Sequence, residues 1–203
     1  MSGRKQFDVG VALDQAMRVF WQRGYADASL DALGSATGLG RGSLYGAFGT
    51  KDALFGQCLD RYARIYGAQY EQALTAYPGE PVRAVEAFFD VVLSRIADPS
   101  VPVGCLVAQS AAQSPTLKEE NRTQVRGLLD QQRQRVRTAL ADSSADPRTL
   151  DELATFVVAV NQSLAVLSRA GASDAELRSV ARLACATVAD TLSRAASADA
   201  AQG

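Results

Sequence analysis

The sequence contains no histidine, the side chain that most often serves as a general base or as a metal ligand. It has three cysteines, Cys58, Cys105 and Cys185, which lie far apart and form no Cys-x-x-Cys pair. An odd number of scattered cysteines argues against a disulfide framework and is a poor basis for a zinc site. We therefore expect a protein that is not an enzyme and that needs no metal or other cofactor.

Long apolar runs are also absent. The longest, such as FVVAV at 156–160, are far shorter than the roughly 20 residues that span a bilayer. The first residues, MSGRKQFD, lack the apolar core of a signal peptide. The 203 residues are 47% hydrophobic and 21% charged, which is an ordinary composition for a folded protein. These features predict a cytoplasmic protein that has no membrane partner.

Charge is divided unevenly along the chain, although the net charge is only −1. Residues 1–64 contain eight Lys and Arg against six Asp, a charge of +2, so the remaining residues carry −3. A mildly basic N-terminal part on an acidic body is compatible with binding of nucleic acid by that part.

Strand signals are almost absent, and apolar residues recur at helical spacing along the whole chain. Start signals include Asp8, Ser29, Thr50, Asp146-Pro147 and the capping box Ser-Asp-Ala-Glu at 173–176. We predict an all-α fold of about nine helices, at residues 8–24, 29–37, 41–48, 50–77, 82–97, 103–113, 116–141, 146–169 and 173–197.

The stretch LGRGSLYGAFGTK at 39–51 is rich in glycine, a poor helix former, and could be a loop, a phosphate cradle or a helix that approaches something closely. Its flanks favour the last, because two short helices joined by a glycine turn form a helix-turn-helix, whose second helix enters the DNA major groove. Leu44 and Phe48 would face the core. The open face would bind DNA through Ser29, Arg41, Gly42, Ser43, Tyr45 and Lys51.

This part of the chain resembles the TetR family of bacterial transcriptional regulators. The resemblance covers about residues 7–66 and rests on Phe20, Gly24, Ser29, Leu33, Gly38-Leu39, Gly42-Ser43-Leu44-Tyr45, Phe48, Lys51 and Leu54-Phe55. It implies a homodimeric repressor that binds a palindromic double-stranded operator DNA and leaves it when a small-molecule effector enters the C-terminal domain. We place the DNA-binding domain at 6–66 and the effector-binding and dimerisation domain at 67–203.

The chain departs from the family pattern at two places in this motif. Gly40 stands where the family usually has a capping Ser or Thr, and Gly46-Ala47 stand where a bulky Tyr or His often follows the tyrosine. Base or phosphate contacts from the side chains at positions 46 and 47 are therefore excluded. Specificity should depend on Arg41 and Ser43, with Ser29 and Tyr45 as further candidates.

The C-terminal part offers weaker candidates for an effector site and a dimer interface. We expect Phe89, Cys105, Gln109, Phe156 and Asn161 to line the effector cavity. Cys105, near a helix start, could be either a buried small hydrophobe or a reactive thiol. The last two helices should pair with those of a second copy through Leu153, Val157, Val160, Leu164, Leu177, Val180, Ala184, Val188 and Leu192.

Two other functions remain open from the residues alone. One is a helical enzyme or carrier that uses a C-terminal cavity, which the absence of histidine and of paired carboxylates disfavours. The other is a helical protein–protein adaptor, which would leave Arg41 and Lys51 without a role.

Overall fold

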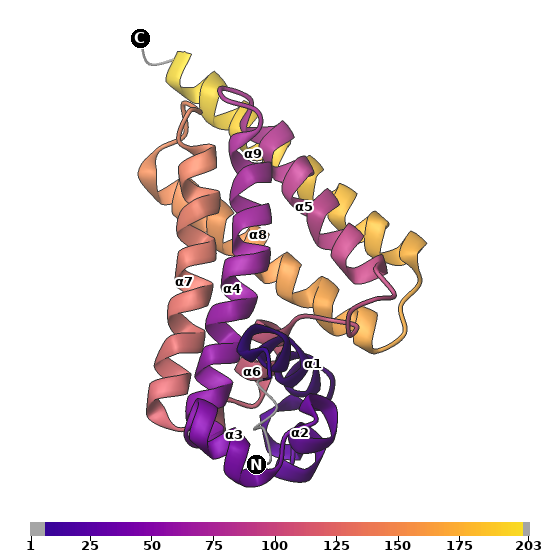
Figure 1. Cartoon of the computed structure of the whole chain (residues 1–203). Helices are drawn as coiled ribbons and strands as arrows, with labels where there is room; N and C mark the ends of the chain where they lie inside the picture. The colour runs from indigo at the N-terminus through magenta and orange to yellow at the C-terminus, as the bar shows by residue number, and fades with distance from the viewer. Residues whose placement is uncertain (1–6, 201–203) are drawn as a thin grey trace.

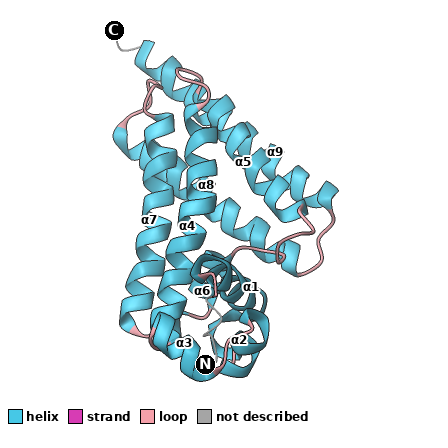
Figure 2. Cartoon of the chain, in the orientation of Figure 1, coloured by secondary structure: helices cyan, strands magenta, loops and turns pink. Residues whose placement is uncertain are grey.

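The computed structural model describes residues 7–200, and within that range it is built from helices and loops alone (Figure 2). The helices are α1 Val9–Asp27, α2 Leu30–Thr37, α3 Arg41–Phe48, α4 Lys51–Thr75, α5 Pro81–Ala97, α6 Leu106–Ala112, the 3-10 turn η1 Ser114–Thr116, α7 Glu119–Leu140, α8 Pro147–Arg169 and α9 Asp174–Ala200. The predicted all-α fold of about nine helices is confirmed.

Four boundaries differ from the sequence prediction by three residues, one of them the end of α9, which lies at Ala200 rather than at 197. The first helix continues past Gly24 to Asp27, with Gly24 itself in a non-helical conformation. The sixth helix begins at Leu106 rather than 103, because Gly104 has φ +92° and Cys105 is extended. The seventh begins at Glu119, since η1 occupies Ser114–Thr116.

Helix α4 connects the two ends of the molecule (Figure 1). Its first half packs against α1 and α3, and its length packs against α7 and α5. Helices α1, α2 and α3 lie at one end, whereas α5, α8 and α9 pack on one another at the other end (Figure 1). The predicted division between residues 66 and 67 falls inside α4, so both parts of the chain share this helix.

Aromatic side chains pack α1 against α4. Phe20 and Trp21 of α1 are fully buried. The Phe20 ring lies 5.0 Å from that of Phe55, and the Trp21 ring lies 5.0 Å from that of Tyr62, both on α4. Because such rings bury large apolar areas, they fix α1 firmly on α4.

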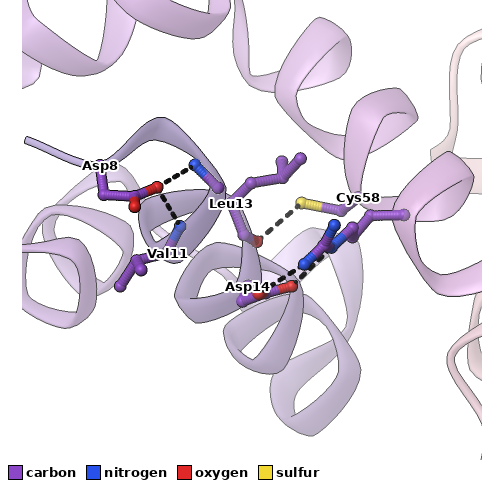
Figure 3. A network of polar contacts seen from close by, with 7 residues as sticks. Asp8, Val11, Leu13, Asp14 and Cys58 are labelled. Atoms are coloured by element: carbon purple, nitrogen blue, oxygen red, sulfur yellow. Dashed lines mark hydrogen bonds and ion pairs between the residues drawn. The ribbon is translucent and has the colours of Figure 1, made fainter. Parts of the chain in front are cut away.

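Polar contacts fix the start of α1 as well (Figure 3). The Asp8 carboxylate accepts hydrogen bonds from the backbone N–H of Gly10 and Val11, as the predicted N-cap requires. Asp14 accepts two hydrogen bonds of 2.9 Å from the Arg61 guanidinium on α4. Cys58 is buried, with Sγ 3.9 Å from the Leu13 carbonyl, and burial raises the pKa of its thiol.

Helix α8 is the one helix among residues 7–200 that is long and apolar enough, by composition alone, to cross a membrane. The count of apolar runs in the sequence did not identify it, because Asn161 and Gln162 interrupt the run. Its inward face, which includes Leu153, Val157 and Leu164, is packed in the core of the chain. That packing is typical of a core helix of a folded domain.

Candidate nucleic-acid interface

Helices α2 and α3 form a compact pair whose ends are defined by local chemistry. The Ser29 hydroxyl accepts a hydrogen bond of 3.1 Å from the N–H of Ala32 and so caps α2. Gly38 ends α2 in the left-handed region at φ +67°, which favours glycine. Gly40 precedes α3 and supplies no capping side chain, so the first N–H groups of α3 stay available to an external acceptor.

Helix α3 has one buried face and one open face. Leu44 and Phe48 are 2% and 3% exposed and attach the helix to the core. Arg41, Gly42, Ser43 and Tyr45 are exposed, and Tyr45 keeps 47% of its surface open although it is a large ring. The open face of α3 therefore keeps Arg41, Ser43 and Tyr45 outside the core and accessible to another molecule.

Glycines on this open face have no structural requirement within the chain. A Cβ atom built on Gly40, Gly42 or Gly46 would meet nothing within 4 Å, and none of the three has positive φ. Gly38 and Gly49, in contrast, have φ of +67° and +77°. Packing within the chain therefore does not require glycine at these three positions. The absence of side chains there would instead allow another molecule to come close to the backbone of α3.

The guanidinium of Arg41 is held by a carboxylate from the preceding helix. Its Nη2 lies 2.8 Å from Oδ1 of Asp31, and Nε donates to the same oxygen at 3.3 Å. Both side chains are mostly exposed, 65% for Arg41 and 78% for Asp31. The hydrogen bond and the charge of Asp31 raise the pKa of Arg41, which stays cationic.

Lys51 is more enclosed than the sequence indicated. Its Nζ lies 4.5 Å from the centre of the Tyr25 ring and 3.4 Å from the Ala26 carbonyl oxygen, to which it donates. Burial lowers the pKa of Lys51, while Asp52 and Asp27 act in the opposite direction. The ammonium group is thus positioned at the junction of α1 and α4.

Asp52, next in the chain, joins three helices. It accepts a hydrogen bond of 2.6 Å from the Tyr25 hydroxyl and forms an ion pair of 2.7 Å with Lys118. Burial, the hydrogen bond to Asp52 and its charge raise the pKa of Tyr25 to about 12. Burial acts to raise the pKa of Asp52, but the bonds from Lys118 and Tyr25 outweigh it and lower the value.

Of the six predicted DNA-binding residues, the structure leaves five exposed on the N-terminal helices and places Lys51 half-buried beside Tyr25. Sequence reasoning did not find Asp31, Tyr25 or Lys118 as their neighbours. Asp31 and Arg41 are ten positions apart on different helices, so no helical periodicity links them.

The predicted effector residues are only partly brought together. Cys105 and Asn161 line one small cavity of about 40 Å³, with Tyr62, Tyr70 and Gln132. Phe89 instead lines a groove between α5 and α9 with Cys185, and Gln109 and Phe156 line neither space. The spacing of apolar residues in α6 and α8 does not predict which of these side chains face the cavity and which do not.

Besides the predicted Asn161, buried polar side chains that the sequence did not single out lie in or next to this cavity. Asn161 is 1% exposed, and its Oδ1 has no hydrogen-bond partner among the described residues. The Tyr62 hydroxyl lies 3.2 Å from Sγ of Cys105 and donates to it. Arg95, 5% exposed, donates from Nε to the Tyr70 hydroxyl at 2.9 Å and from Nη1 to the Gly104 carbonyl.

The residues predicted for a dimer interface mostly face inward. Seven of the nine are buried within the chain itself: Leu153, Val157, Leu164, Leu177, Ala184, Val188 and Leu192. Val160 and Val180 are half-buried. The large apolar side chains exposed on α8 and α9 are Val166, Leu167 and Leu183, at 58%, 40% and 71%. These seven side chains form the core of one chain, so little of their surface is left for contact with a second copy.

Comparisons with known proteins agree with this geometry. Residues 12–58 match the family described as "Bacterial regulatory proteins, tetR family", and residues 81–184 match "Tetracyclin repressor-like, C-terminal domain". The chain is 31% identical over 185 residues to the HTH-type transcriptional repressor ComR of Escherichia coli (strain K12), covering 87% of each protein.

A solved structure extends the likeness to three dimensions. A cysteine mutant of the TetR family transcriptional regulator CifR, complexed with 26bp double-strand operator DNA, is 31% identical. It superposes with a TM-score of 0.77 over 89% of this chain and 96% of that chain.

Proposed function

The chain belongs to the TetR family of bacterial regulatory proteins, and on that premise we propose that it is a homodimeric repressor released from a palindromic operator by a small-molecule effector. The observation that carries the proposal is the division of α3 into a buried face and an open face without bulky side chains except Arg41 and Tyr45. Such a helix can lie close to base edges in the major groove. The protein would act in the cytoplasm.

Each open-face residue has a distinct task in this proposal. Arg41 exchanges Asp31 for acceptors on a guanine edge, the pairing that most often specifies a base. Ser29, Ser43 and Tyr45 donate hydrogen bonds from their hydroxyl groups to phosphate oxygens, and Gly42 lets the backbone of α3 approach the phosphates. Lys51 adds a positive charge near the backbone, which supports binding to any sequence.

Residues 6–66 would form the DNA-binding domain, and residues 67–203 the effector-binding and dimerisation domain. Two copies would pair through the outward faces of α8 and α9, where Val166, Leu167 and Leu183 are uncovered. Val160 and Val180, which are half-buried, lie at the edge of this surface. A two-fold axis there would present two reading helices to the two halves of a palindrome.

We place the effector at the cavity lined by Cys105, Asn161 and Tyr62. There the amide oxygen of Asn161 has no hydrogen-bond donor among the described residues, so a ligand could supply one. The present space of about 40 Å³ holds only a few waters, so a larger effector must open it. A covalent effector would be an electrophile that the Cys105 thiolate attacks, as it would attack iodoacetamide with loss of iodide and of the thiol proton. Treatment with iodoacetamide distinguishes covalent from non-covalent action. If the reagent releases the wild type from the operator but does not release Cys105→Ser, the thiol is required.

The function is tested by selecting bound fragments from a genomic library and measuring their affinity by gel shift. We expect a palindromic fragment to bind. Arg41→Ala should weaken that binding about tenfold or more and relax the preference at one base position. Lys51→Ala should weaken binding to all sequences and reduce the salt dependence. Wild-type affinity in both folded variants contradicts the assignment.

A further inference from the structure

Helix α1 is interrupted at Gly24, which has φ +80° and ψ 172°. A break of this kind removes the i to i+4 hydrogen bonds that would cross it. Carbonyl groups before the break and N–H groups after it then need other partners. Both sets find them on side chains that lie far away in the sequence.

Arg169, the last residue of α8, provides donors for the carbonyl groups. Its Nη1 donates to the Trp21 carbonyl at 3.1 Å, and its Nη2 donates to the Gln22 carbonyl at 3.1 Å. A cation at this end of a helix segment is also favoured by the helix dipole. The C-terminal end of α8 is thereby attached to α1.

Gln113, which follows α6, provides the acceptor for the N–H groups. Its Oε1 accepts from the N–H of Tyr25 at 2.8 Å and from that of Ala26 at 3.5 Å. A Cβ on Gly24 would lie 2.4 to 2.7 Å from the Gln113 amide. Gly24 is therefore required both for its positive φ and for the passage of this side chain.

Arg169 also reaches the loop that leads to the small cavity. Its Nη1 donates to the Val103 carbonyl at 3.2 Å, and a Cβ on Gly104 would lie 2.7 Å from its Cγ and Cδ. The next two residues are held by other helices, Gly104 by Arg95 on α5 and Cys105 by Tyr62 on α4. One side chain thus touches both α1 and the segment that borders the cavity.

We propose that Arg169 and Gln113 are positioning residues that hold α1 at a fixed angle to α8, and with it the reading helix α3, which is connected to α1 through α2. A molecule that displaces residues 103–105 would move Arg169, loosen α1 at Gly24 and change the spacing of two reading helices in a dimer. This inference rests on the proposed function, because the spacing matters only if a dimer binds DNA. Figure 1 shows α6, which carries Gln113 at its end, lying against α1.

The first experiment uses the full-length protein without DNA and measures amide hydrogen exchange at Tyr25 and Ala26. Gln113→Leu should speed exchange of these two amides about tenfold, whereas Gln113→Glu, which keeps an acceptor, should leave it near the wild-type rate. Arg169→Ala should change the fluorescence of Trp21, the single tryptophan, while Arg169→Lys changes it less. Arg148→Ala is the matched control, since Arg148 lies on α8 but is 87% exposed and pairs with Glu152.

The second experiment measures exchange at residues 103–109 with and without the selected DNA fragment. In the wild type and in Arg148→Ala, bound DNA should slow this exchange. In Arg169→Ala, DNA should no longer slow the exchange, and the affinity for the DNA fragment should fall about tenfold. If Gln113→Leu and Arg169→Ala match the wild type in amide exchange and in operator affinity, these contacts are surface caps only and the inference is wrong. If no fragment binds the wild type, the proposed function fails, but the first experiment still decides whether the two residues hold α1.

Discussion

Arg41 and Asp31 link the two short helices of the N-terminal unit through a pair of hydrogen bonds to one carboxylate oxygen. The pair is solvent-exposed, so water and salt weaken it. Asp31 therefore orients Arg41 before DNA binds, but the ion pair is weak enough for Arg41 to leave it. An acceptor with better geometry, such as a guanine edge, can replace the carboxylate.

Asp31→Asn should lower the discrimination between operator and unrelated DNA. Removing the carboxylate frees Arg41 and takes away a negative charge that phosphates repel. We expect affinity for unrelated DNA to rise roughly two- to fivefold at low salt, with a smaller change for the operator. Gel shifts with both DNAs measure the ratio. Glu152→Gln, which breaks a similar exposed pair on α8, is the control, and an unchanged ratio in Asp31→Asn would count against this role.

Gly42→Ala should separate stability from DNA binding. The new methyl group meets nothing in the chain and restricts the unfolded state, so the free energy of unfolding should rise by up to about 1 kcal/mol. The same methyl group should obstruct the approach of DNA and weaken operator binding. Gly127→Ala on α7, where a Cβ also meets nothing, should stabilise without affecting DNA affinity. Urea unfolding and gel shifts check both, and full affinity in Gly42→Ala would refute the close approach.

Substitutions on the two faces of α8 and α9 should have different consequences. Leu183→Arg, at a 71% exposed position, should produce folded monomers in sedimentation experiments. Leu164→Arg places a charge at a fully buried position and should lower the free energy of unfolding by about 3 kcal/mol or more. Circular dichroism distinguishes the two outcomes. A Leu183→Arg variant that stays dimeric would place the interface elsewhere.

Burial of Tyr25, together with its hydrogen bond to Asp52, should make stability depend on pH in the alkaline range. The folded-state pKa of Tyr25, about 12, exceeds its ordinary value of 10.0, so folding favours the protonated phenol. Its contribution is complete below pH 10 and is lost as the pH rises toward 12. Tyr25→Phe should therefore lose less stability than the wild type between pH 10 and 12 in urea titrations. Equal losses would show that the other tyrosines account for the whole effect.

Local signals in the sequence determined the helices and the family. Caps such as Ser29 and Asp8, the turn glycine Gly38, and the capping box in which Ser173 and Glu176 exchange hydrogen bonds all act within four residues. The same short range predicted that Leu44 and Phe48 share the buried face of α3. These features depend on neighbours along the chain, so the sequence alone was sufficient for them.

Only the tertiary structure decided which faces and partners meet. Helices α8 and α9 carry apolar residues on more than one face, and periodicity does not say which face lies inward. The sequence therefore predicts a dimer contact for Leu164 and Val188, whereas both are buried in the core of their own chain. The pairing of Arg41 with Asp31 and the reach of Arg169 to Trp21, 148 positions away, likewise have no local signature. Hydrogen bonds and burial of this kind depend on how helices pack against one another, and that packing is a property of the whole chain.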